Sequence, residues 1–135
     1  LEGNELLDAL RELAKEAATP CEFVCKKPLV VPAATALSLL RIAEEAVRNA
    51  VRHATANKIL ISLRATTRTL TLEVRDDGQG LAVAPTASHK LSGVALMQRH
   101  AHEIQGKLEL HSEPGQGTRV SCTVPLASQP KPADL

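Results

Sequence analysis

The stretch EEAVRNAVRHA, residues 44–54, combines two patterns that decide how this chain folds. Together with the residue just before it, its apolar residues recur at the spacing of a helix that packs one face on a core: Ala43, Ala46, Val47, Ala50 and Val51. Four polar residues lie at offsets zero, four, seven and eight from the first, and therefore share another face of the same helix: Glu45, Asn49, Arg52 and His53. A solvated helix face explains this row as well as a binding site does, so the rest of the chain must decide between them.

The composition around this helix is that of one globular domain. The chain has 135 residues, and 44% of them are hydrophobic, which is enough for a single core and argues against disorder. The net charge of +1 gives no basic excess for nucleic acid, and Phe23 is the one aromatic residue, so stacking platforms for bases are missing. We therefore expect one domain over residues 1–126, a polar tail over 127–135, and no nucleic-acid partner.

No apolar run in the sequence reaches the roughly 18 residues of a membrane span, and the charged, amphipathic start of the chain does not resemble a signal peptide. We expect no membrane contact by this stretch of protein. Because Leu1 is not an initiator methionine, we also expect further sequence upstream of it.

The three cysteines predict neither a disulfide nor a metal site. Cys21 and Cys25 lie in an expected strand, where four residues span about 13 Å, beyond the reach of a disulfide. Cys122 has no partner pair that would complete a zinc site. We expect all three to be buried, reduced thiols.

Periodicity and turn residues predict the order α-β-α-β-β-loop-α-β-β. Helices are expected over about 4–18, 33–56 and 93–106, the last closed by Gly106 as its C-cap, and strands over 21–27, 58–65, 69–76, 107–112 and 118–126, with a hairpin turn at 66–68 and a loop over 76–92. Three helices and five strands in this order make a two-layer α/β sandwich with a mixed sheet.

The strand over 69–76 runs directly into DDGQG, residues 76–80. Two glycines one residue apart, Gly78 and Gly80, allow a sharp turn and a close approach of a ligand. The carboxylate of Asp76, at the strand end, can accept a hydrogen bond from an exocyclic amine such as that of adenine. Taken alone, the motif fits a β-turn with two solvated acids better, because short glycine motifs are common.

Two later motifs change that balance. SGVALM, residues 92–97, is expected to put Gly93 at a helix start, where free N–H groups favour a phosphate. GQGT, residues 115–118, brings Thr118 to the start of the final strand. Each has a structural explanation by itself, but their order along the chain is specific.

In that order, the four motifs resemble the N box, the two glycine boxes and the closing GT motif of the GHKL ATPases. The whole pattern is most similar to the ATP-binding catalytic domain of sensor histidine kinases, and the short segment between the glycine boxes to the nitrate-sensor class. The resemblance covers residues 30–126 well and 1–29 weakly. It implies the Bergerat ATPase fold, with a mixed five-stranded sheet packed on three helices, and ATP and Mg²⁺ as cofactors.

Carried over residue by residue, the resemblance assigns Mg²⁺ to Asn49 and adenine to Asp76, with Thr118 supporting the adenine contact. Glu45 corresponds to the general base of related ATPases, and in a kinase it would support metal and phosphate geometry. The remaining expected nucleotide contacts are Arg52, His53, Gly78, Gly80, Gly93 and Val94. The second glycine box departs from the family, because Ser92 precedes a lone glycine, which leaves its phosphate contacts open.

The activity implied is transfer of the γ-phosphate to a histidine on a separate dimerisation domain, within a two-component system that includes a response regulator. The parent would be a homodimer and this domain cytoplasmic, with membrane anchorage of the parent left open. Two alternatives stand beside it: a nucleotide-gated interaction module without phosphotransfer, and a GHKL ATPase, for which a longer lid and a transducer domain would be expected.

Overall fold

The computed structural model describes residues 3–26, 31–53, 57–78, 88–113 and 115–126. Their helices and strands follow the predicted order: α1 (Gly3–Glu16), β1 (Cys21–Val24), α2 (Ala33–His53), β2 (Ile59–Ala65), β3 (Thr69–Asp76), α3 (Ser88–Glu103), β4 (Lys107–Glu113) and β5 (Gly117–Pro125). The expected continuation of α2 through residues 54–56 and the tail over 127–135 lie outside the described residues.

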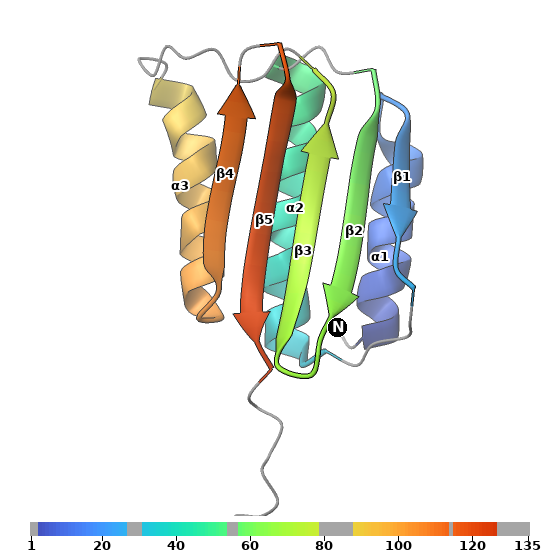
Figure 1. Ribbon diagram of the computed structural model, residues 1–135, viewed down its shortest axis with the longest axis vertical. Helices are drawn as coiled ribbons and strands as arrows, with labels where there is room; N and C mark the ends of the chain where they lie inside the picture. The colour runs from blue at the N-terminus through green and yellow to red at the C-terminus, as the bar shows by residue number, and fades with distance from the viewer. Residues whose placement is uncertain (1–2, 27–30, 54–56, 79–87, 114, 127–135) are drawn as a thin grey trace, which may run out of the picture.

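The five strands form one mixed sheet in the order β1-β2-β3-β5-β4. β1 pairs with β2 in parallel, while the other three pairings are antiparallel. All three helices lie on one face of this sheet and leave the other face open, as Figure 1 shows. The predicted two-layer α/β sandwich is confirmed.

Strict alternation along the strands creates the core. In β2 and β3, every second residue is buried against the helices, from Ile59 to Leu63 and from Leu70 to Val74. The apolar stripe of α2 supplies the opposing surface, with Ala43, Ala46 and Ala50 all less than 5% exposed. Small residues on this stripe let α2 approach the sheet closely, so its polar neighbours are held against the strand ends.

Helix α3 differs from prediction at both ends. It begins at Ser88, so residues 88–92, expected in the loop, are helical and Gly93 is its sixth residue. At its other end, Gln105 adopts the left-handed conformation with φ of 58°, and the amides of Gln105 and Gly106 donate to the carbonyls of His102 and Ala101 at 3.0 and 2.8 Å. This is a Schellman motif, in which Gln105 takes the position that a glycine usually fills.

Gly106 is therefore not the left-handed residue of the cap. A Cβ atom at Gly106 would come within 2.9 Å of the Cys122 sulfur on β5 and within 3.3 Å of the Thr123 carbonyl oxygen. The position is glycine because the chain passes close to the sheet there, not because of its φ angle.

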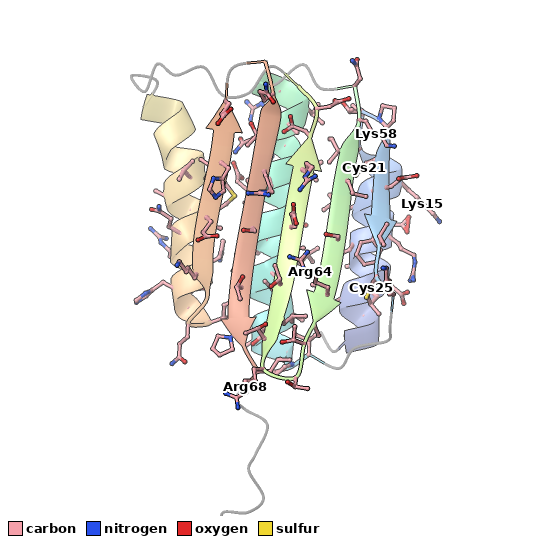
Figure 2. The ribbon with its side chains drawn as sticks, viewed as in Figure 1. Lys15, Cys21, Cys25, Lys58, Arg64 and Arg68 are labelled. Atoms are coloured by element: carbon pink, nitrogen blue, oxygen red, sulfur yellow. The ribbon has the colours of Figure 1, made fainter. Side chains whose placement is uncertain are left out.

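The prediction of three buried thiols is right for Cys122 and wrong for the other two. Cys122 is fully buried, which raises its pKa to about 11. Cys21 and Cys25 are half-buried, because β1 is a short edge strand that is covered on one side only. Cys21 begins β1 and Cys25 directly follows its last residue (Figure 2), and none of the three cysteines forms a disulfide. Within the described residues, no helix is long and apolar enough to span a membrane.

Candidate functional site

Asp76 ends β3, the central strand of the sheet, where its neighbours fix it from both sides. It pairs in register with Ile59 on β2 and with Thr118 on β5. Only 8% of the residue is exposed, and its carboxylate accepts hydrogen bonds from the backbone amide of Gly78 at 2.8 Å and from that of Thr118. Burial raises the pKa of Asp76, and these two hydrogen bonds oppose the rise. The result is a buried, oriented acceptor at a strand end.

Gly117 allows β5 to come this close to Asp76. Its φ is +87°, and a Cβ atom there would lie 2.1 Å from the Asp76 carbonyl oxygen, so no other residue fits without moving the backbone. The next residue, Thr118, is buried, and its hydroxyl is within 3.1 Å of the Ser112 hydroxyl on β4. From the sequence, Gly117 is predicted only as part of a turn, and Ser112 is not identified as a site residue.

Asp77 has a structural task that sequence reasoning did not find. Its Oδ1 accepts hydrogen bonds from the backbone amides of Asn57 at 2.8 Å and Lys58 at 2.9 Å, just before β2. These bonds, led by the one from Lys58, lower the pKa of Asp77. The two acids therefore have different roles. Asp76 faces the helix layer, while Asp77 binds the segment that leads into β2.

Between α2, α3 and the sheet lies a small recess with apolar walls. Its polar groups are Asn49, Asp76 and Thr118, which come from three different elements. Its apolar lining consists of Ala46, Ala50, Val74, Val94, Leu110 and Val120. Apolar walls with a few convergent polar groups are typical of ligand sites, but the described residues enclose only about 20 Å³ here, less than a purine base fills.

Glu45 lies one helical turn before Asn49 and is 9% exposed. Arg48 Nη1 binds its Oε1 at 2.5 Å. On the other side, a Cβ atom built at Gly93 would come 2.8 Å from Glu45 Oε2 and 3.7 Å from Asn49 Oδ1. Gly93 is thus where α3 crosses α2, directly over the two oxygen-bearing side chains.

This placement corrects the expectation that Gly93 starts a helix. The free N–H groups of an α-helix belong to its first four residues, and Gly93 is the sixth of α3. A phosphate contact through free helix-start N–H groups therefore cannot come from Gly93. The role that the geometry supports is to leave room for Glu45.

The other candidates divide into three groups. Val94 lines the recess, and Gly78 contacts Asp76. Arg52 is exposed and is not among the residues that line the recess. His53 ends α2, but its side chain and the whole of Gly80 lie outside what the structure describes.

The comparisons with known proteins agree with this geometry. A model of the family described as histidine kinase-, DNA gyrase B-, and HSP90-like ATPase matches residues 34–128, well over half of the chain. The chain belongs to this ATPase family. The match begins at the start of α2 and includes Asn49, Asp76 and Thr118, the three polar groups of the recess.

Within the family, the domain is similar to two proteins of Bacillus subtilis (strain 168). It is 32% identical to the sensor histidine kinase LnrJ, over 92% of this chain and 31% of LnrJ, and 32% identical to the sensor histidine kinase LiaS, over 97% of this chain and 37% of LiaS. The chain thus spans about a third of the length of these relatives.

Solved structures share the fold of this ATPase-family domain. The histidine kinase domain of the Erythrobacter litoralis EL346 blue-light activated histidine kinase matches 94% of this chain and 62% of its own, with a TM-score of 0.69 at 22% identity. The Acinetobacter baumannii histidine kinase AdeS matches 90% of this chain and 61% of its own, with a TM-score of 0.65 at 16% identity.

Proposed function

We propose that this chain is the ATP-binding catalytic domain of a two-component sensor histidine kinase, which binds Mg-ATP and passes the γ-phosphate to a histidine on a separate domain. One observation carries the proposal most: the buried Asp76 carboxylate, fixed by two backbone amides beside an apolar recess. An acceptor so placed suits the exocyclic amine of adenine. The family membership and the kinases among the relatives support the same assignment.

In this proposal, Thr118 supports the adenine contact, with its hydroxyl held by Ser112. The apolar lining, including Val94, excludes water from the faces of the base. Gly78 contributes through its amide, which fixes the Asp76 carboxylate. Gly80, Arg52 and His53 remain proposed nucleotide contacts.

The donor set at α2 fits Mg²⁺. Asn49 and Glu45 both bring oxygens to the region below Gly93, and hard oxygen ligands are what this cation prefers. Within the described residues, no group of three or more His, Cys, Asp or Glu side chains is arranged to hold a metal. Asn49 would therefore act with the phosphates of the nucleotide, and Mg²⁺ would supply charge neutralisation.

Phosphoryl transfer depends on positioning and electrostatics more than on covalent chemistry by the protein. The chain's contribution is to hold adenine at Asp76, to orient Asn49 and Glu45 toward the phosphates, and to keep Glu45 in place through Arg48. We propose as partners a dimerisation domain that carries the acceptor histidine and a response regulator. The parent is proposed to be a homodimer, with this domain in the cytoplasm.

A second candidate is a nucleotide-gated interaction module without phosphotransfer. It is favoured by the place of Gly93 inside α3, since the expected phosphate contact at a helix start is not formed there. Nucleotide binding fits both candidates, and transfer of phosphate to a partner histidine separates them.

Calorimetric titration of ADP and ATP with and without Mg²⁺ tests the proposal. Asn49→Ala should weaken Mg-ATP about tenfold or more, a loss near 1.4 kcal/mol, and should change metal-free nucleotide far less, because the amide acts through the cation. Asn57→Ala is the matched control, because exposed Asn57 donates a hydrogen bond to Asp77 through its backbone amide, which alanine retains. Equal losses with and without Mg²⁺ would make Asn49 structural, and no nucleotide binding by the unmodified chain would end the proposal.

A further inference from the structure

The open face of the sheet carries a row of basic side chains at the end where β3 stops. Arg75 on β3 pairs in register with Arg119 on β5, and Arg119 pairs in register with His111 on β4. These three residues alternate with the buried positions of their strands, so they point away from the helix layer. Directly opposed residues on one face have Cβ atoms about 5 Å apart, and like charges so placed are destabilising.

The arginines of this face differ in their partners. Arg64 and Arg75 are both exposed, and each binds Glu73, at 3.4 and 3.0 Å. Arg119 is less exposed than either, yet among the described residues no acid lies within ion-pair distance of it. Of these three guanidinium groups, the one that is harder to solvate therefore has no counter-charge within the described part of the chain.

Arg119 also lines a hollow of about 510 Å³, together with Arg75, His111, Gln116 and Glu113. That volume is in the range of small-ligand sites. The opposite face of the sheet holds the recess described above, and Asp76 and Thr118 border both cavities. The hollow is open to solvent at the end of the sheet where β3 and β4 stop and β5 begins.

Besides Asp76, whose carboxylate is bound by the Gly78 amide, two acids line the hollow and restrict what can enter. Glu113 lies two residues from His111 on the same face of β4, and the carboxylate of Asp77, although its Oδ1 is bound by two amides, borders the hollow as well. A polyanion such as nucleic acid would meet both charges. A single small oxyanion can reach Arg119 and His111 while leaving the acids at the rim.

We propose that this hollow, which we call the open-face pocket, binds a small oxyanion, a phosphate or carboxylate group, between Arg119 and His111. Arg119 offers a planar fork that matches two oxygens, and His111 and the Gln116 amide provide further donors. The bound charge relieves the repulsion within the basic row. This inference stands on the open face of the sheet and does not depend on the proposed kinase function.

NMR of the ¹⁵N-labelled chain tests this inference with inorganic phosphate as the probe, titrated at constant ionic strength. We expect saturable shifts of the Arg119 side-chain and His111 signals with half-saturation at about 1–10 mM, a weak site with few contacts. A parallel titration with acetate distinguishes a preference for phosphate from one for carboxylate. Signals of Asn49 and Ala50 report on the recess and should stay unchanged.

Three variants make the result decisive. Arg119→Gln should lower the affinity for phosphate at least about tenfold. Arg119→Lys should give an intermediate affinity, because lysine keeps the charge but loses the bidentate fork. Arg64→Gln, on the same face but paired with Glu73 and outside the pocket, should bind like the unmodified chain. Thermal melts verify that the variants fold. Linear, unsaturable shifts, equal affinity in Arg119→Gln, or shifts centred on Asn49 would each overturn the proposal.

Discussion

At the scale of single residues, the candidate site depends on how β3 meets β5. Asp76 keeps its orientation because Gly78 and Thr118 donate to its carboxylate and because Gly117 lets the neighbouring strand approach. A neutral amide at position 76 would present an NH₂ group to one of these two donors. The same exchange would remove the acceptor for an exocyclic amine.

Asp76→Asn should therefore lower ADP affinity by ten- to a hundredfold, since a charge-assisted hydrogen bond contributes about 1.5–3 kcal/mol. The unmodified chain should lose affinity on acidification at a higher pH than an ordinary aspartate would allow, because burial raises the pKa of Asp76 and the protonated group accepts less well. Calorimetry across a pH series measures both effects. Asp8→Asn, on the exposed face of α1, is the control, and unchanged affinity in Asp76→Asn would remove this residue from the site.

Gly93 provides a second test at this scale. A methyl group there would displace Glu45 Oε2, which lies 2.8 Å from the Cβ position, and a shift of this carboxylate would disturb its ion pair with Arg48. Helix propensity alone would favour alanine by about 1 kcal/mol, so the two effects have opposite signs. We expect the change in the free energy of unfolding caused by Gly93→Ala to be at least about 1 kcal/mol more destabilising in the unmodified chain than in the Glu45→Ala variant.

Urea denaturation of the four proteins in this double-mutant cycle measures the coupling. The Glu45→Ala background supplies its own control, because the clash is absent there. Additive effects of the two substitutions would show that α3 does not rest on Glu45.

Whether the role of a residue can be predicted from sequence depends on whether its contacts lie nearby in the chain. Asn49, Asp76, Val94 and Thr118 were identified from motifs, and the structure brings them together. The bond between Ser112 and Thr118, and that from Lys58 to Asp77, depend on strand register and on chain segments far apart in sequence. No short motif carries that information.

At the scale of elements, alternation predicted β2 and β3 well because each has one buried face, and the turn between them follows the polar residues 66–68. The start of α3 was placed wrongly. Residues 88–92 follow a Gly-, Ala- and Pro-rich stretch and show no clear amphipathic pattern, so nothing local marks Ser88 as the beginning of a helix. Its last residue is Glu103 rather than 106, and the left-handed cap residue is Gln105, one position before the expected Gly106, which is a glycine for packing.

At the cap of α3, substitutions at two neighbouring positions should change the stability of the fold in opposite directions. Gln105→Gly should stabilise the fold by about 0.5–1 kcal/mol, because a left-handed conformation costs glycine little, although glycine also gains entropy in the unfolded chain. Gly106→Ala should destabilise it, because the added methyl meets the Cys122 sulfur and the β5 backbone. Midpoints of urea denaturation measure both stability changes. If Gln105→Gly were less stable than the unmodified chain, the Gln105 side chain would make a stabilising contact of its own.

At the scale of the whole molecule, the sheet separates two environments. The helix face holds the recess, and the open face holds the basic row around Arg119. Asp76 and Thr118 border both cavities, so ligands on either face of the sheet would reach the same residues at the end of β3.

The same arrangement bears on whether the chain can act as its own phosphoacceptor. His111 lies on the open face, across the sheet from the recess, and His100 and His102 occupy the last turn of α3, where His100 binds Glu103 at 3.5 Å. His53 is in α2 and His89 is in the first turn of α3, with side chains outside the described set. In-line transfer requires an acceptor nitrogen close behind the phosphorus, and binding of nucleotide alone does not provide it.

We therefore expect this chain to bind Mg-ATP without phosphorylating itself. Incubation with labelled Mg-ATP, followed by an assay for acid-labile phosphate, tests this, and ADP calorimetry on the same sample shows that the site is intact. Label should appear only when a helical domain carrying the acceptor histidine is added, and then on that domain. Label on this chain alone would contradict the prediction, and its loss in His89→Ala would identify the acceptor as the histidine nearest the start of α3.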